Sequence, residues 1–150
     1  MVELMAPAGS LEGARTALAA GADAVYAGLT NLSLRPARAE FNDEEFAQIV
    51  SLAHDRSKKV YAVLNVFLKD EDLALFDSEL AAVNRMGADA VLVADAGAIE
   101  AVRTRYPNLP IHVSVQNSVT TPETAKFYEK LGASVIVLSR NTTDFSEIKR

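Results

Sequence analysis

Cysteine is absent from this sequence of 150 residues. These residues therefore cannot form a disulfide, supply a thiol nucleophile, or hold zinc or an iron–sulfur cluster through sulfur. No apolar run approaches the roughly 20 residues that cross a bilayer. Glu3 stands where a signal peptide would carry lysine or arginine, and no apolar stretch of the signal type follows it. We expect a cytoplasmic protein without a membrane partner.

Two nucleotide-binding motifs and an excess of basic charge are also missing. Neither a G-x-G-x-x-G fingerprint nor a P-loop occurs, so the sequence does not signal binding of a dinucleotide or a nucleoside triphosphate. The formal net charge is -5, from 15 basic and 20 acidic side chains, which argues against a surface that coats nucleic acid generally. Any contact with RNA must be local. With 49% apolar and 23% charged residues, the composition is that of an ordinary globular domain.

The sequence alternates short β-branched runs with amphipathic stretches, which is typical of parallel β/α units. We predict six strands, at Glu3–Ala6, Ala24–Gly28, Lys59–Val66, Ala90–Asp95, Ile111–Gln116 and Ser134–Arg140. We predict helices at Leu11–Ala20, Asp43–Ser57, Leu73–Met86, Ala96–Tyr106 and Pro122–Leu131, and a sixth that begins near Asp144. Asn42 with Glu45 has the pattern of a capping box, and Thr121 before Pro122 that of an N-cap.

An internal repeat marks three of the joins from helix to strand. Gly21, Gly87 and Gly132 each follow a periodic helix in the strings GADAVYAG, GADAVLVAD and GASVIVLSR. A residue at positive φ ends a helix at low cost in such a position, so we interpret the repeat as structural and not as a ligand motif. One long connection without apolar periodicity runs from Leu29 to Asn42, and such connections are more often functional than accidental.

Six parallel units fit either an open doubly wound sheet or most of a (β/α)8 barrel. The fifth predicted strand has one polar and one apolar face. The polar face consists of His112, Ser114 and Gln116, and the apolar face of Ile111, Val113 and Val115. A central strand of a doubly wound sheet is apolar on both faces, so this pattern favours a barrel strand whose polar side chains enter the lumen while helices cover the apolar face.

Four of the predicted strands end in a polar residue, and the carboxyl ends of barrel strands converge on the catalytic face. These residues are Asn65, Asp95, Gln116 and Arg140. Each alone could be a strand-terminal residue that meets water, but the four together favour a site. We predict that they are catalytic residues that line the lumen and orient the reacting group.

A complete barrel needs eight units and typically about 250 residues, whereas we count six. We therefore expect residues 1–150 to be the N-terminal part of an incomplete, TIM-barrel-like (β/α)8 domain of the α/β class, because Ser146 to Arg150 resembles a helix interrupted partway. The strands near Leu4 and Val137 should then each present an unpaired edge. Such edges pair with other chains, and we expect a homo-oligomer assembled through them.

The long connection carries two arginines, Arg35 and Arg38, close to Tyr26 at the end of the second predicted strand. Guanidinium groups on a loop above a barrel suit recognition of a carboxylate or a phosphate. A solvated loop with an ion pair to Glu40 is the structural alternative. We predict that Tyr26, Arg35, Arg38 and the lumen-facing Ser114 bind substrate.

The two histidines are interpreted as structural. His54 lies within a helix on the outside of the barrel, and His112 opens a strand near the N-terminal rim, opposite the usual site. Neither can complete a serine–histidine–aspartate triad. Two isolated histidines also make a poor zinc site, so we predict no metal site.

A series of motifs, in order along the chain, is similar to part of a known family. They are MAPAGS, GADAVYAGLTNLSLRPARAEFN, KKVYAVLNV, VLVADAGAI, PIHVSVQ and VIVLSR. Together they resemble the N-terminal part of the collagenase-like peptidases of family U32, over essentially the whole chain. Despite that name, well-understood members resemble RNA hydroxylation enzymes, including the prephenate-dependent tRNA wobble-uridine hydroxylation proteins. The resemblance implies an enzyme part that binds tRNA or another RNA and a small carboxylate co-substrate.

The resemblance also carries expectations about what lies outside this chain. Full-length relatives have downstream cysteines that hold an iron–sulfur cluster, which implies a cluster in a longer form and no cofactor within this chain. Asn117 and Ser118 stand where the family usually has Ala-Asn, and Asn141 stands where a glutamate is usual. If that glutamate takes part in the chemistry, its replacement puts activity in question.

Three hypotheses remain open at this point. The first is the substrate-binding part of an RNA (tRNA uridine) hydroxylase. The second is a collagenase-like protease that takes its nucleophile or metal ligands from residues outside this chain. The third is a catalytically silent, truncated barrel that acts as an assembly module. We expect this fragment alone to be inactive.

Overall fold

A computed structural model describes residues 2–29, 32–33 and 40–142 of the chain. Its strands are β1 (Met5–Pro7), β2 (Ala24–Leu29), β3 (Glu40–Phe41), β4 (Lys59–Leu64), β5 (Ala90–Val93), β6 (Ile111–Val113) and β7 (Ala133–Ile136). Its helices are α1 (Leu11–Ala19), α2 (Asp43–His54), α3 (Leu73–Met86), α4 (Ala96–Arg105) and α5 (Pro122–Lys130). Two short 3-10 turns, η1 (Asp70–Asp72) and η2 (Val115–Asn117), complete the elements.

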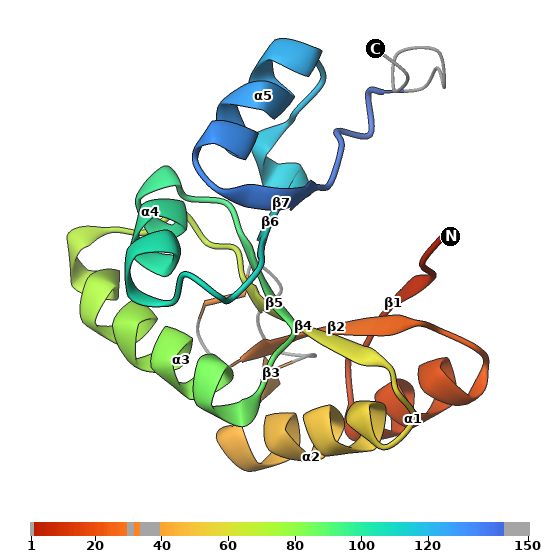
Figure 1. The fold of residues 1–150 in the computed structure, drawn as a ribbon. Helices are drawn as coiled ribbons and strands as arrows, with labels where there is room; N and C mark the ends of the chain where they lie inside the picture. Colours follow the sequence, from red (N-terminus) through yellow and green to blue (C-terminus); the bar gives the residue numbers. More distant parts are fainter. Residues whose placement is uncertain (1, 30–31, 34–39, 143–150) are drawn as a thin grey trace.

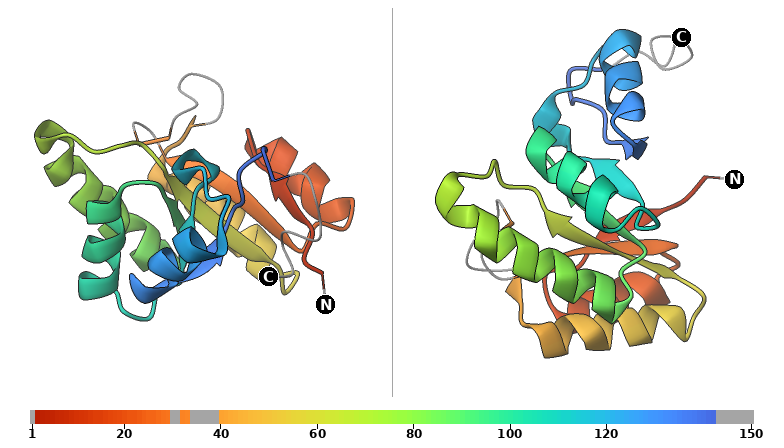
Figure 2. Two further views of the ribbon diagram at one scale, coloured as in Figure 1. Left: turned by 90° about the horizontal axis from the view of Figure 1, so that it is seen from above. Right: turned by 60° about the vertical axis from the view of Figure 1, so that its left-hand side comes forward.

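The strands follow one another through the sheet in chain order, β1-β2-β4-β5-β6-β7, and every pairing is parallel. A doubly wound sheet would reverse its order at a switch point and carry helices on both faces. Here the order never reverses, and Figures 1 and 2 show a curled sheet with the helices along its convex side. The prediction of an incomplete barrel is therefore confirmed: six consecutive parallel strands and the five helices of the described residues form an open barrel segment.

The two faces of the sheet have different partners because successive strand residues point to opposite sides. Val25, Val60 and Val91 point outward and are fully buried in the main core, which includes helix residues such as Phe46. On the lumen side, Ala24, Tyr61 and Ala90 form a second, smaller cluster. As predicted for β6, Ile111 and Val113 belong to the outer core, whereas the ring of His112 packs against Tyr61 in the lumen.

The internal repeat performs one structural task three times. The carboxylate of Asp23 accepts a hydrogen bond from the Leu4 amide (3.0 Å), and that of Asp89 accepts one from the Val60 amide (2.8 Å). In the third copy the hydroxyl of Ser134 donates to the Ile111 carbonyl (3.0 Å). In each copy the side chain ties its own strand to the start of the strand before it in the sheet.

The glycines that open the three copies have φ values of 102°, 85° and 102°. These angles lie in the left-handed region that a side chain with Cβ rarely adopts. The structural interpretation of the repeat is therefore confirmed. The two predicted helix starts are confirmed as well, because Asn42 and Glu45 form a reciprocal capping box and Thr121 caps α5.

The fifth predicted strand ends earlier than the sequence suggested. β6 stops at Val113, and the chain turns into η2, where the hydroxyl of Ser114 accepts from the Gln116 amide (3.4 Å). Serine side chains compete with the ladder in this way because they offer the backbone a local hydrogen bond. The expectation that Val115 packs beneath the helices is wrong, since Val115 lines a cavity on the lumen side.

The long connection contains a strand that was not predicted. β3 has only two residues and pairs in parallel with the end of β2, with Leu29 opposite Phe41. Phe41 is buried in the main core. The rest of this connection, and the sixth helix predicted near Asp144, lie outside the described residues.

Both outer edges of the sheet are open in the described part of the chain. There β1 pairs only with β2, and β7 only with β6, as predicted. Among the same residues, no helix has the length and apolar character needed to cross a membrane.

Candidate functional site

A cavity of about 490 Å³ lies at the carboxyl ends of the strands, which is a usual volume for a ligand site. Its polar lining comes from Tyr26 at β2, Ser33, Asn65 after β4, Ser114 and Gln116 after β6, and Arg140 after β7. Apolar walls are contributed by residues such as Pro7 and Leu92. The structure thus brings together five of the eight residues that the sequence singled out: Tyr26, Asn65, Ser114, Gln116 and Arg140.

The other three predicted residues do not line this cavity. Asp95 is the N-cap of α4, and its Oδ1 accepts a hydrogen bond from the Ala98 amide at 3.0 Å. An aspartate at this position satisfies a helix amide that would otherwise lack a partner. Asp95 therefore begins α4, and it is not among the residues that line this cavity. Arg35 and Arg38 lie outside the described residues.

The cavity wall is tied together by Ser114, which is fully buried. Its hydroxyl oxygen accepts from Asn65 Nδ2 at 3.3 Å and from the Gln116 amide at 3.4 Å. Asn65 and Ser114 follow strands that are two places apart in the sheet, with β5 between them. The bond spans the concave side, and it fixes the spacing of the β4 and β6 ends.

Asn117 fastens the turn that carries Gln116. Its Nδ2 donates to the Ala94 carbonyl and to the Tyr128 hydroxyl, both at 2.7 Å. The side chain therefore links η2 to the start of α4 and to α5. Sequence reasoning identified Asn117 only as a departure from the family pattern, because a contact with Tyr128 depends on how α5 packs.

The charge of the lining is one-sided. Arg140 is its only ionisable basic group, and no aspartate or glutamate is present among the described lining residues. This differs from the chain as a whole, whose formal net charge is -5. A cavity of this kind favours an anionic or neutral polar ligand over a cation.

Below the cavity, the floor of the lumen holds Glu3, Lys59, Tyr61 and His112. Glu3 accepts hydrogen bonds from Lys59 Nζ (2.8 Å) and from the Tyr61 hydroxyl. The ring of His112 meets that of Tyr61 edge to face, with centroids 4.5 Å apart. These groups come from alternate strands of the barrel, which is how side chains fill a barrel in layers.

Contacts and burial in the floor of the lumen shift the pKa values of three of its residues. The bond from Lys59, followed by that from Tyr61, lowers the pKa of Glu3. Burial is the main cause that raises the pKa of Tyr61, and the bond to Glu3 adds to it. Burial also lowers the pKa of His112, because a charged imidazole would lose hydration there. The packing of His112 against Tyr61 thus favours the uncharged ring.

The hydrolytic arrangements considered from the sequence do not form here. Ser114 bonds Asn65 and the Gln116 amide, whereas His54 pairs with Asp89 (2.9 Å) at the opposite end of the sheet. Within the described ranges no three histidine, aspartate or glutamate side chains lie close enough to hold a metal ion. Because the sequence has no cysteine, it does not fit an iron–sulfur cluster, whose thiolates would have to come from other residues.

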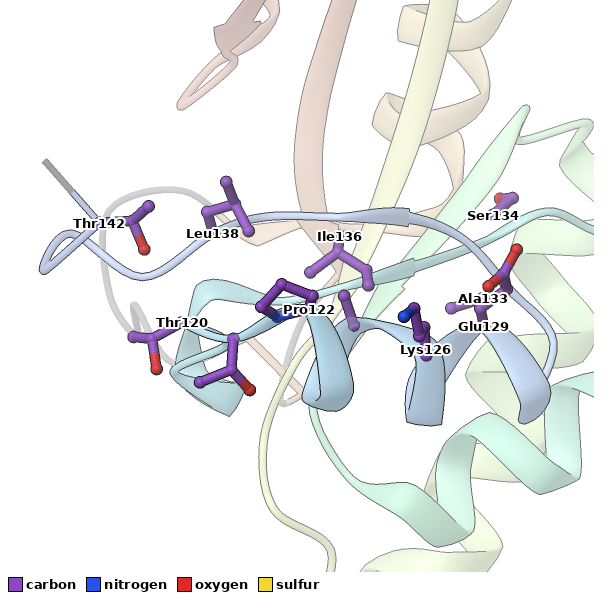
Figure 3. A pocket seen from close by; sticks show the side chains of 11 residues that line it. Thr120, Pro122, Lys126, Glu129, Ala133, Ser134, Ile136, Leu138 and Thr142 are labelled. Atoms are coloured by element: carbon purple, nitrogen blue, oxygen red, sulfur yellow. The ribbon is translucent and has the colours of Figure 1, made fainter. Parts of the chain in front are cut away.

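A second cavity, of about 420 Å³, lies between α5 and β7. Figure 3 shows its lining, with Pro122 and Lys126 on the helix facing Ile136 and Leu138 on the strand side. Its lining includes polar and charged residues such as Thr121, Lys126 and Glu129, but none of the residues that the sequence singled out for a site. We therefore treat the first cavity as the candidate site.

Relatives with established names match nearly the whole chain. The tRNA hydroxylation protein P of Escherichia coli is 42% identical over 138 residues, which cover 92% of this chain and 30% of that protein. The protein of the same name from Haemophilus influenzae is 39% identical over 99% of this chain and 33% of its own length. A collagenase of Porphyromonas gingivalis is 34% identical over 92% of this chain and 33% of its length. The chain spans about a third of the length of these relatives.

Solved structures agree with the fold. A U32 peptidase, Mk0906, superimposes with a TM-score of 0.83 at 26% identity, covering 99% of this chain and 63% of that one. The deoxyribose phosphate aldolase of Aeropyrum pernix gives a TM-score of 0.73 at 19% identity over 99% of this chain and 68% of its own, which shows the barrel fold alone. The sequence profile of Peptidase family U32 matches residues 9–150, and the chain belongs to that family.

Proposed function

We propose that the full-length protein hydroxylates a uridine of tRNA, and that this chain forms the substrate-binding side of its barrel. The observation that carries the proposal is the cavity, in which five predicted polar residues gather and whose described lining contains no carboxylate. Relatives that match the chain over more than nine tenths of its length are named for tRNA hydroxylation, which supports the choice of substrate. The cytoplasm, where tRNA is modified, is the compartment we propose.

The lining suits recognition of a nucleotide. A base must leave its stack to reach an enclosed site, and proteins hold such a base by stacking and by hydrogen bonds to its edge. Tyr26 offers an aromatic ring, and Asn65, Ser114 and Gln116 offer amide and hydroxyl groups. Arg140 suits a phosphate of the RNA or the carboxylate of a small co-substrate.

We further propose that Arg35 and Arg38 bind an anionic group of the RNA or of the co-substrate. The reason is the chemistry of two guanidinium groups in the connection after β2. Binding of tRNA and of carboxylates to the full-length protein should weaken in the Arg35→Ala and Arg38→Ala variants. Unchanged binding in both would contradict this assignment.

Mass spectrometry of tRNA from a strain that lacks the gene tests the main proposal. Hydroxylated uridine should disappear from that strain and return when the full-length protein is restored. A deletion strain whose tRNA keeps its full content of hydroxylated uridine would contradict the proposal.

The second candidate function is proteolysis. It is favoured by the collagenase name of one relative and by the name of the family. The described residues offer no paired nucleophile and base for it, so its catalytic groups would come from elsewhere. Digestion of gelatin or casein by purified full-length protein would support this candidate, and the absence of digestion would count against it.

A further inference from the structure

The second cavity lies on the outer side of a strand that no described helix covers. β4, β5 and β6 are followed by α3, α4 and α5, which pack along the convex side of the sheet. In α4, for example, Ala98, Ile99 and Val102 are fully buried. Among the described residues no helix follows β7. Ile136 and Leu138, which line the second cavity, are therefore only partly buried.

The part of the chain that the structure describes ends at this cavity. The Ser139 amide donates to the Val119 carbonyl (2.9 Å), and the Thr142 amide donates to the Ser139 carbonyl (3.0 Å). This turn places Thr142 in the lining of the cavity, where its hydroxyl oxygen is buried and has no hydrogen-bond partner among the described residues. A chain advances by at most about 3.5 Å per residue, so Phe145 lies within about 10 Å of Thr142. The residues that follow Thr142 can thus enter the cavity without a linker.

The residues after Thr142 have an amphipathic pattern. They read TDFSEIKR from 143 to 150, and we predict a helix that begins near Asp144. Phe145 and Ile148 are three positions apart, so they would share one face of this helix. A threonine that precedes a helix accepts a hydrogen bond from an amide of the first turn. Such a bond would satisfy the buried hydroxyl of Thr142.

We propose that residues 144–150 dock in the second cavity, with Phe145 and Ile148 packed against Ile136 and Leu138. Removal of these apolar side chains from water is the driving force. The segment is preferred over a second copy of the chain because it is tethered beside the cavity, and a short tether acts like a partner concentration on the order of millimolar. The docking concerns packing alone and does not depend on the proposed function.

The direction of the helices and the charges at the rim set the orientation of the docked segment. Helices that follow the strands of a barrel all start at the carboxyl ends of those strands, so α5 and the docked helix run in parallel. α5 begins at Pro122, and Lys126 in its second turn lines the cavity. Glu147 is at a similar distance from Asp144, on the flank beside the apolar face of the predicted helix. We therefore expect the carboxylate of Glu147 to face the ammonium group of Lys126.

A designed disulfide tests the docking, because the chain has no cysteine of its own. Lys126→Cys with Glu147→Cys brings two thiols within bonding distance if the segment docks as proposed. Phe127→Cys with Glu147→Cys is the matched control, since Phe127 is the next residue of α5, is exposed, and does not line the cavity. Both pairs are equilibrated in glutathione buffers, and the oxidised fraction is measured by peptide mass spectrometry. The effective concentration of the two thiols should be at least about tenfold higher in the Lys126 pair.

Two further measurements identify what fills the cavity. Adding Phe145→Ser and Ile148→Ser to the Lys126 pair should lower its effective concentration to that of the control. In a mixture of isotopically light and heavy chains, the disulfide should form within one chain. Equal effective concentrations in the two pairs, which an undocked or unfolded segment would give, would overturn the inference and leave the proposed function standing. A disulfide mainly between light and heavy chains would place a second copy in the cavity and would overturn it as well.

Discussion

The strands β2, β5 and β7 each follow a copy of the same repeat, but the outer strand β7 has very different surroundings from the inner strands. In β2, β4 and β5 nearly every residue is buried, whereas neither β7 nor α5 contains a single buried residue. Val91 in β5 is fully buried, while Val135 in β7 is 45% exposed. Each inner strand has a neighbour on both sides, and in the described part of the chain β7 has one. Burial in this fold is thus set by neighbouring units more than by the composition of a strand.

The same difference explains the two cavities. The polar cavity lies where strand ends from the whole segment converge, and several elements fix its side chains. The second cavity, shown in Figure 3, lies between α5 and β7 at the outer edge of the sheet, where the next unit of a complete barrel would pack. The first is therefore a candidate for chemistry, and the second for packing.

The largest expected effect comes from a pair of phenylalanines, one in each region. Phe46 on α2 is fully buried, and Phe127 on α5 is 53% exposed. Phe46→Ala should lower the free energy of unfolding by about 3–5 kcal/mol, and Phe127→Ala by less than about 1 kcal/mol. Urea denaturation followed by circular dichroism measures both. Equal losses of unfolding free energy in the two variants would show that α2 and α5 contribute equally to stability and would contradict the comparison.

The repeat allows a second comparison. Asp89 accepts from the Val60 amide between inner strands, and Ser134 donates to the Ile111 carbonyl at the outer unit. Removal of the charged partner in Asp89→Ala should cost about 1.5–3 kcal/mol, and Ser134→Ala about 0.5–1.5 kcal/mol. Asp89→Asn, which keeps an acceptor oxygen, is the matched control and should cost less than Asp89→Ala. A larger loss in Ser134→Ala than in Asp89→Ala would reverse the comparison.

The open edge of β7 leads to a prediction about assembly. We propose that the isolated 150-residue chain associates with itself through the edges of β1 and β7, since exposed β-prone edges pair. Val135→Lys should weaken the association about tenfold, because a charged edge strand resists pairing. Leu75→Lys on α3, also a partly exposed position, should not. Sedimentation at micromolar concentration measures this, and a monomeric wild-type chain would refute the proposal.

The smallest effect concerns β6, which lies between the two regions. Burial lowers the pKa of His112. Below about pH 6.5 the imidazole of His112 therefore takes up a proton more readily in the unfolded chain than in the folded one. The free energy of unfolding should fall as pH drops from 7.5 to 5, by at most about 1.4 kcal/mol per pH unit.

His112→Phe keeps a ring against Tyr61 and should remove that part of the slope, as measured by urea denaturation at each pH. Glu3 contributes little in this range, because the loss of stability that follows from its lowered pKa begins near the ordinary glutamate pKa of 4.5 and grows only at lower pH. A slope that His112→Phe leaves unchanged would show that this histidine is not the group responsible.

The sequence predicted the regular parts of the fold closely. The starts of β2, β4, β5 and β6 and both ends of α3 coincide with the predicted residues, because apolar periodicity and glycine caps are local signals. The end of β6 depends on whether Ser114 joins the ladder or bonds its own turn. β3 depends on pairing with β2, and no two-residue pattern predicts that.

The candidate site was predictable to a similar degree. Polar residues at strand ends predicted Asn65, Gln116 and Arg140 correctly as cavity residues. Asp95 also follows a strand, but it directly precedes α4. Aspartate is a common N-cap residue, and Asp95 caps α4 by accepting a hydrogen bond from the Ala98 amide. The role of Asn117 could not be predicted, since Tyr128 reaches it only through the packing of α5.

The most direct test of the proposed site compares one residue from each cavity. Full-length Arg140→Ala and Lys126→Ala are each expressed in the deletion strain, and hydroxylated uridine in tRNA is measured by mass spectrometry. Arg140 lines the first cavity, at the strand ends, and Lys126 lines the second cavity, between α5 and β7. We predict that Arg140→Ala loses most of the modification while Lys126→Ala retains it. Full modification in Arg140→Ala, or its loss only in Lys126→Ala, would contradict the assignment of the polar cavity as the site.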